Sequence, residues 1–335
     1  YAEQFWGFDD KFSCTYPQRL AHFTDLMKLA DKYGGYLIVS FCGEWYGASL
    51  NPVAMMKRDA NFAAVCKEHP EHFIMCEKYT QTTCFYDNES VCLGSFISGV
   101  NGNYGIRFDQ CGWVNEDSTE DKFPEGAGAA PVLNNMMLNG GTVTDGPELI
   151  WQQCFKENNA YTTADGYTAR RWSTYPQFNN VSMDLFRKIL DKTVRIPSRD
   201  EVIKRTKVAI IDNMNTGDSW TDYATPSDLF DGLYNMDDTK HMQTNQTWFK
   251  KSGRYPTIPT VAFMADSMAK SLPVQVNRSA YTSRWGNKAT KVAEFNRLFP
   301  QEYTGDAYAS RVENGWLTYN PYKTNRTASA VIPFK

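Results

Sequence analysis

The stretch YLIVSFC (residues 36–42) carries the clearest fold signal in the chain, because it is apolar throughout apart from one serine. A continuous apolar run of this length is typical of a strand that is buried on both faces of a parallel sheet. The segment before it, residues 17–33, has apolar residues at helical spacing. A buried strand beside an amphipathic helix indicates an α/β fold.

The same alternation continues on both sides of this strand. The strand starts at residues 36, 73, 104 and 142 are 37, 31 and 38 residues apart, and a (β/α)8 barrel averages about 31 residues per unit. A doubly wound open sheet alternates in the same way, although no GxGxxG loop joins a strand to a helix here. We expect strands at residues 1–8, 73–79, 104–109 and 142–145, and helices at residues 52–69, 88–98 and 130–138.

The pattern changes after about residue 205. Short strand-like pieces follow, separated by Gly, Pro and Asn turns. They predict a β-rich region over residues 206–335, after an α/β region over residues 1–205. The expected strands there are VAIIDN (208–213), PTIPTVAF (256–263), WLTYNPY (316–322) and TASAVIPF (327–334), with one helix at residues 288–298.

Composition excludes several classes of partner. A net charge of −3 and a pI near 5.9 argue against nucleic acid, which calls for a basic surface. Runs of about 18 apolar residues, which a membrane span needs, are missing from the sequence. Aromatic residues make up 14% of the chain, which fits either a bulky core or a cleft that stacks rings on sugars.

The cysteines and histidines favour neither a zinc site nor a catalytic thiol. All eight cysteines lie in the first half, none forms a CxxC pair, and the four histidines are not spaced with them as ligands. We therefore expect small buried thiols, no metal and no cofactor. A pairing of Cys42 or Cys76 with His22 stays open, whereas a GxSxG serine elbow is missing from the sequence.

Carboxylates mark the ends of the expected strands. Functional residues of parallel α/β folds cluster beyond the C-terminal ends of their strands. Glycoside hydrolysis needs one carboxylic acid to protonate the leaving oxygen and one carboxylate to activate water or attack. Each acid could instead cap a helix or pair with a nearby Lys or Arg. The acids are Glu3, Glu44, Glu77, Asp109, Asp145 and Glu148, the basic residues are Lys78, Arg107 and Arg170, and the flanking rings are Trp6, Trp45, Tyr79, Trp113 and Trp151.

A long, ordered set of motifs resembles glycoside hydrolase family 98. The set extends over essentially the whole chain, which makes chance a poor explanation. Its members are YAEQFWGFDD (1–10), KYGGYLIVSFCGEW (32–45), FIMCEKYTQ (73–81), YGIRFDQCGW (104–113), TVTDGPELIWQQCFKE (142–157), TYPQFNN (174–180), VRIPSRDEVIKRTKVAIIDN (194–213), LFDGLY (229–234), GRYPTIPTV (253–261), AYTSRW (280–285), LFPQEYTGDAYASR (298–311) and TASAVIPFK (327–335).

The resemblance implies a bacterial enzyme that is secreted or held at the cell surface. It implies an inverting endo-glycosidase with a (β/α)8 barrel followed by a β-sandwich, often joined to carbohydrate-binding modules outside this chain. Family members are endo-β-1,4-galactosidases that release blood-group A and B oligosaccharides from glycoconjugates, and others act on xylan. Counting the strand of residues 1–8 as the fourth makes the next four the fifth to eighth, so the first three are expected in sequence before Tyr1.

Roles for individual residues also follow from the resemblance. The general acid falls on Glu3 of YAEQFW, and the pair that holds the attacking water falls on Asp109 of YGIRFD and Glu148 of DGPEL. Substrate contacts are expected from Trp6, Trp45, Glu77, Lys78, Tyr79, Arg107, Trp113, Trp151 and Arg170. A non-catalytic carbohydrate-binding protein on an incomplete barrel is the alternative from another functional class.

Overall fold

The structure is a computed structural model. It describes residues 2–3, 15–41, 52–79, 85–108, 136–145, 155–174, 183–211, 257–263, 272–277, 308–312, 315–321 and 327–333, together with residues 293 and 297.

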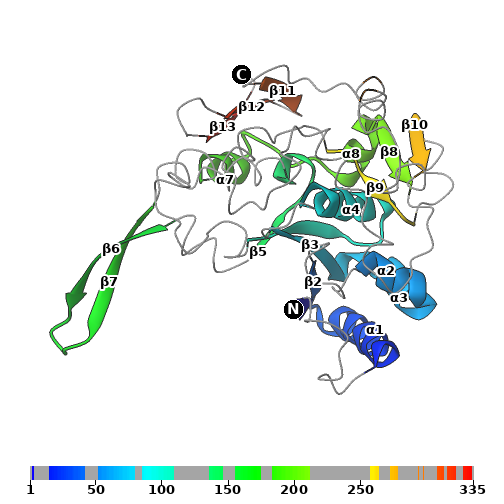
Figure 1. The fold of residues 1–335 in the computed structure, drawn as a ribbon, viewed down its shortest axis with the longest axis horizontal. Helices are drawn as coiled ribbons and strands as arrows, with labels where there is room; N and C mark the ends of the chain where they lie inside the picture. The colour runs from blue at the N-terminus through cyan, green and yellow to red at the C-terminus, as the bar shows by residue number, and fades with distance from the viewer. Residues whose placement is uncertain are drawn as a thin grey trace.

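A five-stranded parallel sheet forms the centre of the first region (Figure 1). Its strands pair in chain order, as expected when each strand is joined to the next by a crossover on one side. All five strands predicted for residues 1–145 are present among the described residues, which include only residues 2–3 of the first strand. They are β1 (Ala2–Glu3), β2 (Leu37–Phe41), β3 (Phe73–Tyr79), β4 (Asn103–Phe108) and β5 (Val143–Asp145).

The described residues therefore have a mixed α/β fold. Five parallel strands in sequence order are compatible with part of a barrel and with an open sheet. Among the residues that the structure describes, the sheet ends at β1 and β5 and does not close, and no β-sandwich is formed. The α/β class is confirmed, whereas the barrel and the sandwich stay predictions.

Helix α1 (Tyr16–Tyr33) begins and ends at clear sequence signals. Thr15 and Gln18 form a capping box at its start, in which each side chain accepts a hydrogen bond from the other residue's backbone N–H. Gly34 ends the helix with a positive φ of 70°, a conformation that glycine adopts without steric cost. The chain is thereby turned directly into β2.

The single helix predicted for residues 52–69 is wrong, because two helices lie there. They are α2 (Pro52–Arg58) and α3 (Ala60–Glu68), and Asp59 lies between them with extended backbone. Its carboxylate accepts hydrogen bonds from the backbone N–H groups of Asn61 and Phe62, at 2.8 and 3.0 Å. Asp is among the strongest N-cap residues, so it starts a new helix instead of continuing the old one.

Three helices cover one face of the parallel sheet. Phe62 of α3 packs edge-on against Phe73 of β3, and Phe96 of α4 (Phe85–Ser98) packs against Tyr104 of β4. Helix α1 packs against β2 and α3, with the ring of Phe23 in α1 near that of Phe62 in α3. The residues on this face of the strands are Leu37, Val39, Phe73, Met75, Tyr104 and Ile106, all of them buried in the hydrophobic core.

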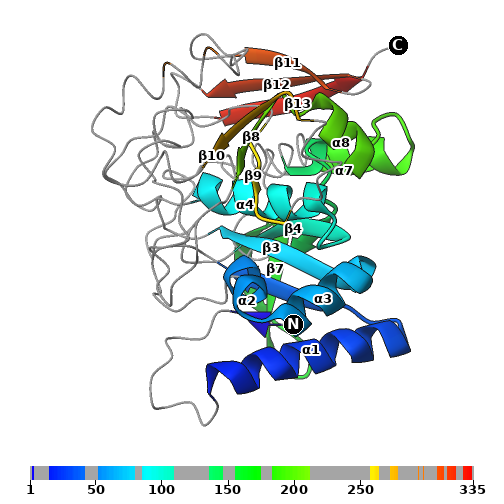
Figure 2. The ribbon, with the colours of Figure 1, turned by 90° about the vertical axis from the view of Figure 1, so that its right-hand side faces the viewer.

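Helix α4 also packs against a second parallel sheet (Figure 2). That sheet has the order β10–β8–β9, from β8 (Val208–Ile211), β9 (Thr260–Val261) and β10 (Val274–Asn277). Ser90 of α4 donates a hydrogen bond to the carbonyl oxygen of Ile258 at 2.6 Å. Gly94 touches β9 so closely that an added Cβ would lie 1.7 Å from the carbonyl oxygen of Thr260. The helix is therefore covered on both sides.

A buried polar network joins the same parts of the chain. Thr257 donates a hydrogen bond to the buried carboxylate of Glu89 at 3.0 Å, and it accepts one from Asn139 at 3.3 Å. Arg205, the last residue of α8 (Arg199–Arg205), donates to the carbonyl oxygen of Leu138 at 2.6 Å. These bonds connect residues 89–139 to residues on both sides of the predicted boundary at 205.

The remaining elements lie outside this core. Strands β11 (Tyr308–Val312), β12 (Gly315–Pro321) and β13 (Thr327–Pro333) form an antiparallel sheet, and helix α7 (Met183–Leu190) precedes α8. Strands β6 (Phe155–Thr162) and β7 (Thr168–Thr174) form a hairpin that projects from the body (Figure 1). The strand predictions at 208–213, 316–322 and 327–334 are confirmed over their described residues, whereas within 256–263 only residues 260–261 form a strand.

Two predicted helices are described only in part. Residues 136–138 are helical within the predicted helix 130–138, and residues 293 and 297 are helical within 288–298. Among the described residues, no helix is both long enough and apolar enough to cross a membrane.

Candidate active site

The C-terminal edge of the parallel sheet is the candidate active site. Because β1 to β5 are all parallel, their C-terminal ends lie at the same edge. The pairing puts Glu3 of β1 opposite Ser40 of β2, and Ser40 opposite Cys76 of β3. Cys76 in turn pairs with Gly105 of β4. Glu3 thus belongs to a row of paired residues that crosses the sheet from β1 to β4.

This row alternates with the positions that face the helices. Val39, Met75 and Tyr104 occupy the row before it, and their side chains pack in the core under the helices. Ser40 and Cys76 are fully buried as well, yet neither belongs to that core cluster. Both faces of the sheet are therefore covered, as is usual for parallel sheets with a filled interior.

The next row of the same alternation carries charged residues. Lys78 of β3 pairs with Arg107 of β4, and Arg107 pairs with Asp145 of β5. Arg107 is half-buried, so its guanidinium group is partly withdrawn from water. Glu77 and Tyr79 stand at the alternate positions of β3, opposite Ile106 and Phe108. The sheet register therefore brings Lys78, Arg107 and Asp145 together, two residues beyond the row of Glu3.

The other predicted catalytic residues follow directly on described strands. Asp109 comes one residue after the end of β4, and Glu148 comes three residues after the end of β5. Both lie outside the described residues, as do four of the predicted sugar-stacking rings: Trp6, Trp45, Trp113 and Trp151.

Arg170 is not at this edge. It lies on β7 opposite Ala160, and its side chain is exposed on the projecting hairpin. The exposed rings of Tyr161, Tyr167 and Trp172 belong to the same hairpin. The structure therefore separates Arg170 from Lys78 and Arg107, with which it was grouped in the sequence.

The described cysteines have the character of structural thiols. Cys66, Cys76 and Cys92 are free and buried, as expected. Burial raises the pKa of the Cys66 thiol, which keeps it protonated and unreactive. His22 is exposed on α1, on the helix side of the sheet, whereas Cys76 belongs to the opposite face. The fold does not bring Cys76 and His22 together, and Cys42, the other cysteine considered, lies outside the described residues.

The described residues also hold a cluster that sequence reasoning missed. Asp31, His69 and Glu71 place one possible metal-ligand atom each within 4.8 Å of one another. They lie where η2 (Pro70–His72) leads into β3, at the N-terminal edge of the sheet and thus at the end opposite the candidate active site. The HPEH motif (residues 69–72) was a visible signal, but the third residue is supplied by a distant helix.

The described surface has one groove close to this cluster. It lies between α1 and α3 and has a volume of about 560 Å³. Thr24, Asp25, Asp59 and His69 are among the residues that line it. None of the predicted catalytic residues is among them, so the groove is separate from the candidate active site.

Comparisons with known proteins assign this chain to a family. The model named Glycosyl hydrolase family 98 matches residues 1–197, and the model of the family's C-terminal domain matches residues 199–335. A curated relative, the blood-group-substance endo-1,4-beta-galactosidase of Clostridium perfringens, is 23% identical over 356 residues. That alignment covers 96% of this chain and 38% of the relative.

Solved structures agree at the level of the fold. The catalytic module of a family 98 glycoside hydrolase from Streptococcus pneumoniae, in complex with the H-disaccharide blood group antigen, matches with a TM-score of 0.65 and 20% identity. The native form of that module and its complex with the LewisY pentasaccharide antigen each match with a TM-score of 0.63. Each comparison covers 98% of this chain and 54% of the module. The chain thus spans about half the length of these modules.

Proposed function

Since this chain belongs to glycosyl hydrolase family 98, we propose that it carries the catalytic residues of an inverting, endo-acting glycoside hydrolase. Glu3 is the general acid, and Asp109 with Glu148 holds the attacking water. The observation that carries this proposal is the parallel arrangement of the sheet. Glu3 belongs to β1, Asp109 follows β4 in the sequence and Glu148 follows β5, and these three strands end at the same C-terminal edge.

The proposed reaction is a single displacement. The carboxyl group of Glu3 donates its proton to the glycosidic oxygen as the bond to the anomeric carbon breaks. Asp109 and Glu148 accept a proton from the water that attacks the opposite face of the sugar ring. Such a water needs acid and base to be about 6.5–9.5 Å apart. Strands β1 and β5 are the two outermost strands of the described sheet, and curvature toward a barrel would bring their C-terminal ends close enough for a gap of this kind.

The charged row of Lys78, Arg107 and Asp145 supports substrate binding at the same edge. A half-buried guanidinium group binds sugar hydroxyls with fixed geometry, because its donors lie in one plane. It also favours ionised carboxylates nearby, which suits the base pair of an inverting enzyme. Rings at Trp6, Trp45, Tyr79, Trp113 and Trp151 would stack on the apolar faces of sugar residues.

For the substrate, we propose a blood-group A or B oligosaccharide that is attached to a galactose-containing glycoconjugate. The name of the Clostridium perfringens relative and the antigens bound in the Streptococcus pneumoniae modules support this choice. Glucuronoarabinoxylan is the alternative substrate within the family. Glycans of this size are outside the cell, so we place the protein at the bacterial surface or in the medium, with any carbohydrate-binding modules outside this chain.

Digestion of defined glycans by the whole protein tests the proposal. Type A, type B and H antigen oligosaccharides and glucuronoarabinoxylan are incubated with it, and the released sugars are identified by mass spectrometry. Release of an intact A or B oligosaccharide, seen first as the inverted anomer by proton NMR, is the expected result. Binding of these glycans without cleavage would instead support a carbohydrate-binding protein, and a retained anomer would contradict the water-activating pair.

A further inference from the structure

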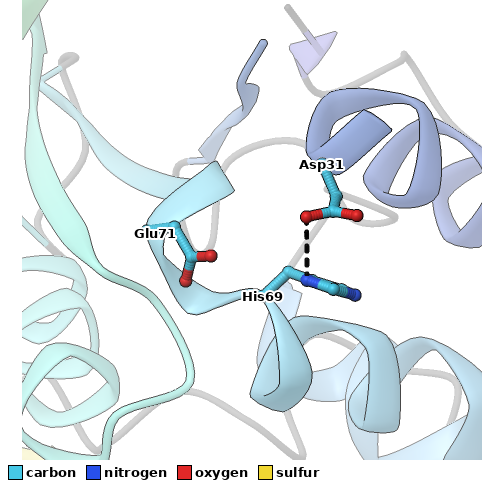
Figure 3. A group of neighbouring side chains, drawn as sticks. All are labelled: Asp31, His69 and Glu71. Atoms are coloured by element: carbon cyan, nitrogen blue, oxygen red, sulfur yellow. Dashed lines mark ion pairs between the residues drawn. The ribbon is translucent and has the colours of Figure 1, made fainter. Parts of the chain in front are cut away.

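The cluster at the N-terminal edge of the sheet joins three segments of the chain. Asp31 lies in the last turn of α1, His69 caps the end of α3, and Glu71 and His72 belong to η2. Figure 3 shows the carboxylate of Asp31 reaching from α1 to the ring of His69, with Glu71 on the adjoining turn. The Nδ1 atom of His69 is 3.2 Å from Oδ1 of Asp31.

The hydrogen bond of His72 determines which of its nitrogen atoms carries the proton. Its Nδ1 atom lies 2.7 Å from the carbonyl oxygen of Gly35, and a carbonyl can only accept, so Nδ1 is the donor. In the neutral ring Nε2 then keeps its lone pair. This nitrogen lies 3.8 Å from Oδ1 of Asp31 and 3.8 Å from Oε1 of Glu71. A lone pair thus faces two carboxylate oxygens.

Such an arrangement has two physical explanations. Either the histidines pair with the carboxylates, as protonated rings or, at His69, through a neutral Nδ1–H donor, or a cation lies among the four groups. A backbone carbonyl that accepts from one ring nitrogen is the usual outer-shell partner of a histidine that binds metal through the other. The contact between His72 and Gly35 therefore favours the cation, and it orients the ring before any ion arrives.

The spacing of the donor atoms suits a small divalent ion. Zinc binds histidine nitrogen and carboxylate oxygen at about 2.0–2.2 Å in a tetrahedron, which separates neighbouring ligand atoms by roughly 3.3 Å. The contact of 3.2 Å between His69 and Asp31 matches that separation, and the contacts of 3.8 Å that His72 makes are about half an ångström longer. The donor atoms of Asp31, His69 and Glu71 all lie within 4.8 Å of one another, so these three residues form the centre of the site and His72 lies beside them. Two imidazoles with carboxylates are also a donor set for which zinc, cobalt and nickel compete.

We propose that Asp31, His69, Glu71 and His72 form a binding site for a divalent transition-metal ion, with zinc as the best chemical match. The side chains of His69 and His72 are 24% and 17% exposed, so the ion is accessible and partly sheltered. His69 also lines the groove between α1 and α3, which gives an ion a path from solvent. The bound metal clamps the end of α1 to the turn that leads into β3.

This site acts on stability and not on the chemical step. It lies at the N-terminal edge of the strands. In folds of this kind, residues at that edge contribute to stability, whereas catalysis takes place at the C-terminal edge. A ligand that binds only the folded state raises its free energy of unfolding in proportion to the logarithm of its concentration over Kd. Zinc should therefore raise Tm while kcat stays the same.

Cobalt titration of the metal-free protein tests the site. The full chain is stripped with a chelator, dialysed, and titrated with Co²⁺ while visible absorption is recorded; Zn²⁺ then displaces the cobalt. His72→Asn keeps a donor for the carbonyl oxygen of Gly35 but removes Nε2, and His69→Gln removes Nδ1. We expect one equivalent of cobalt to bind the parent protein, and at least tenfold weaker binding in the double variant.

Matched variants control for nonspecific effects. His22→Gln removes an exposed histidine from α1, and Glu68→Gln removes a carboxylate that faces the other nitrogen of His69 at 3.9 Å. Both should bind cobalt as the parent does, and all variants should keep the parent circular dichroism spectrum. The rise of Tm with zinc should disappear only in the double variant, which gives a second readout independent of colour.

Three results would overturn the proposal. Saturable binding could be absent up to millimolar cobalt, or it could be equal in the parent and the double variant. Binding could also produce a thiolate-to-cobalt charge-transfer band, which would place the ion at cysteines. If Tm instead depends on pH through His69 and His72 with no effect of zinc, the cluster consists of ion pairs with protonated histidines.

Discussion

Glu3 of β1 lies opposite Ser40 of β2 in a parallel pairing, and Ala2 lies opposite Val39. Glu3 is thus a member of the sheet, two residues before the row of Lys78, Arg107 and Asp145 at its C-terminal edge. This register is the structural basis for assigning chemistry to Glu3.

Replacement of Glu3 by Gln should reduce kcat by about 10²- to 10⁴-fold, because the variant keeps the shape of the side chain and loses its proton. KM and Tm should stay close to the parent values. Steady-state kinetics on the released oligosaccharide, with thermal unfolding as the control for folding, measures both. Activity within threefold of the parent would remove Glu3 from the role of general acid.

Replacement of Gly94 by Ala should destabilise the protein by about 3 kcal/mol or more, at or beyond the upper end for overpacked sites. The reason is the approach of α4 to Thr260, where the new methyl group would meet the carbonyl oxygen at 1.7 Å. Chemical denaturation followed by circular dichroism gives the free energy of unfolding. Gly35→Ala is the matched control, since its Cβ would meet only the Cα of Ala30 at 3.8 Å; equal losses in both variants would contradict the close packing.

Replacement of Asp59 by Ala should cost about 1 kcal/mol of stability, the usual value for an N-cap. The carboxylate of Asp59 binds the N–H groups of Asn61 and Phe62, and alanine leaves both without that acceptor. Asp25→Ala removes an exposed carboxylate from α1 that does not cap a helix, and it should be nearly neutral. Two variants of equal stability would argue that α2 and α3 are set by packing alone.

Glu201 should make stability depend on pH in the acid range. The guanidinium of Arg195 and the N–H and hydroxyl of Ser198 lower the pKa of this carboxyl from 4.5 to about 2. Because the folded pKa lies below the unfolded one, the stabilisation is complete above about pH 4.5 and is lost as the pH falls toward 2. The difference in Tm between the parent and Glu201→Gln should therefore shrink over that interval, and a constant difference from pH 6 to pH 2 would contradict it.

The parallel strands were the part of the fold most open to prediction. Residues 73–79 form β3 with the predicted bounds, because residues 73–76 are an apolar run of the kind that a buried strand requires. The helix predicted over 52–69 failed at Asp59, where one capping side chain outweighs a continuous apolar pattern. An N-cap of this kind stabilises the start of a new helix by about 1 kcal/mol, and the spacing of apolar residues does not reveal it.

The hairpin of β6 and β7 escaped prediction for a different reason. Its described side chains are nearly all exposed, so neither face carries the apolar alternation that marks a half-buried strand. The signal that remained was the turn at Asp165 and Gly166, where glycine has a positive φ of 81°.

The two candidate sites also differ in how far the sequence predicts them. Residues at strand ends were found because a parallel sheet gathers them at one edge. The cluster around His69 was missed because Asp31 reaches it only through the packing of α1 against α3.

The position of α4 between two parallel sheets has a consequence for how this family is divided. Sequence similarity separates the chain between residues 197 and 199, yet one helix supplies core to both parts, with Ser90 and Gly94 fitted against residues 258–260. A break at that border would strip one side of α4 of its partner and expose apolar surface to water. We therefore expect the two matched segments to fold and unfold as one cooperative unit, because each completes the packing around α4.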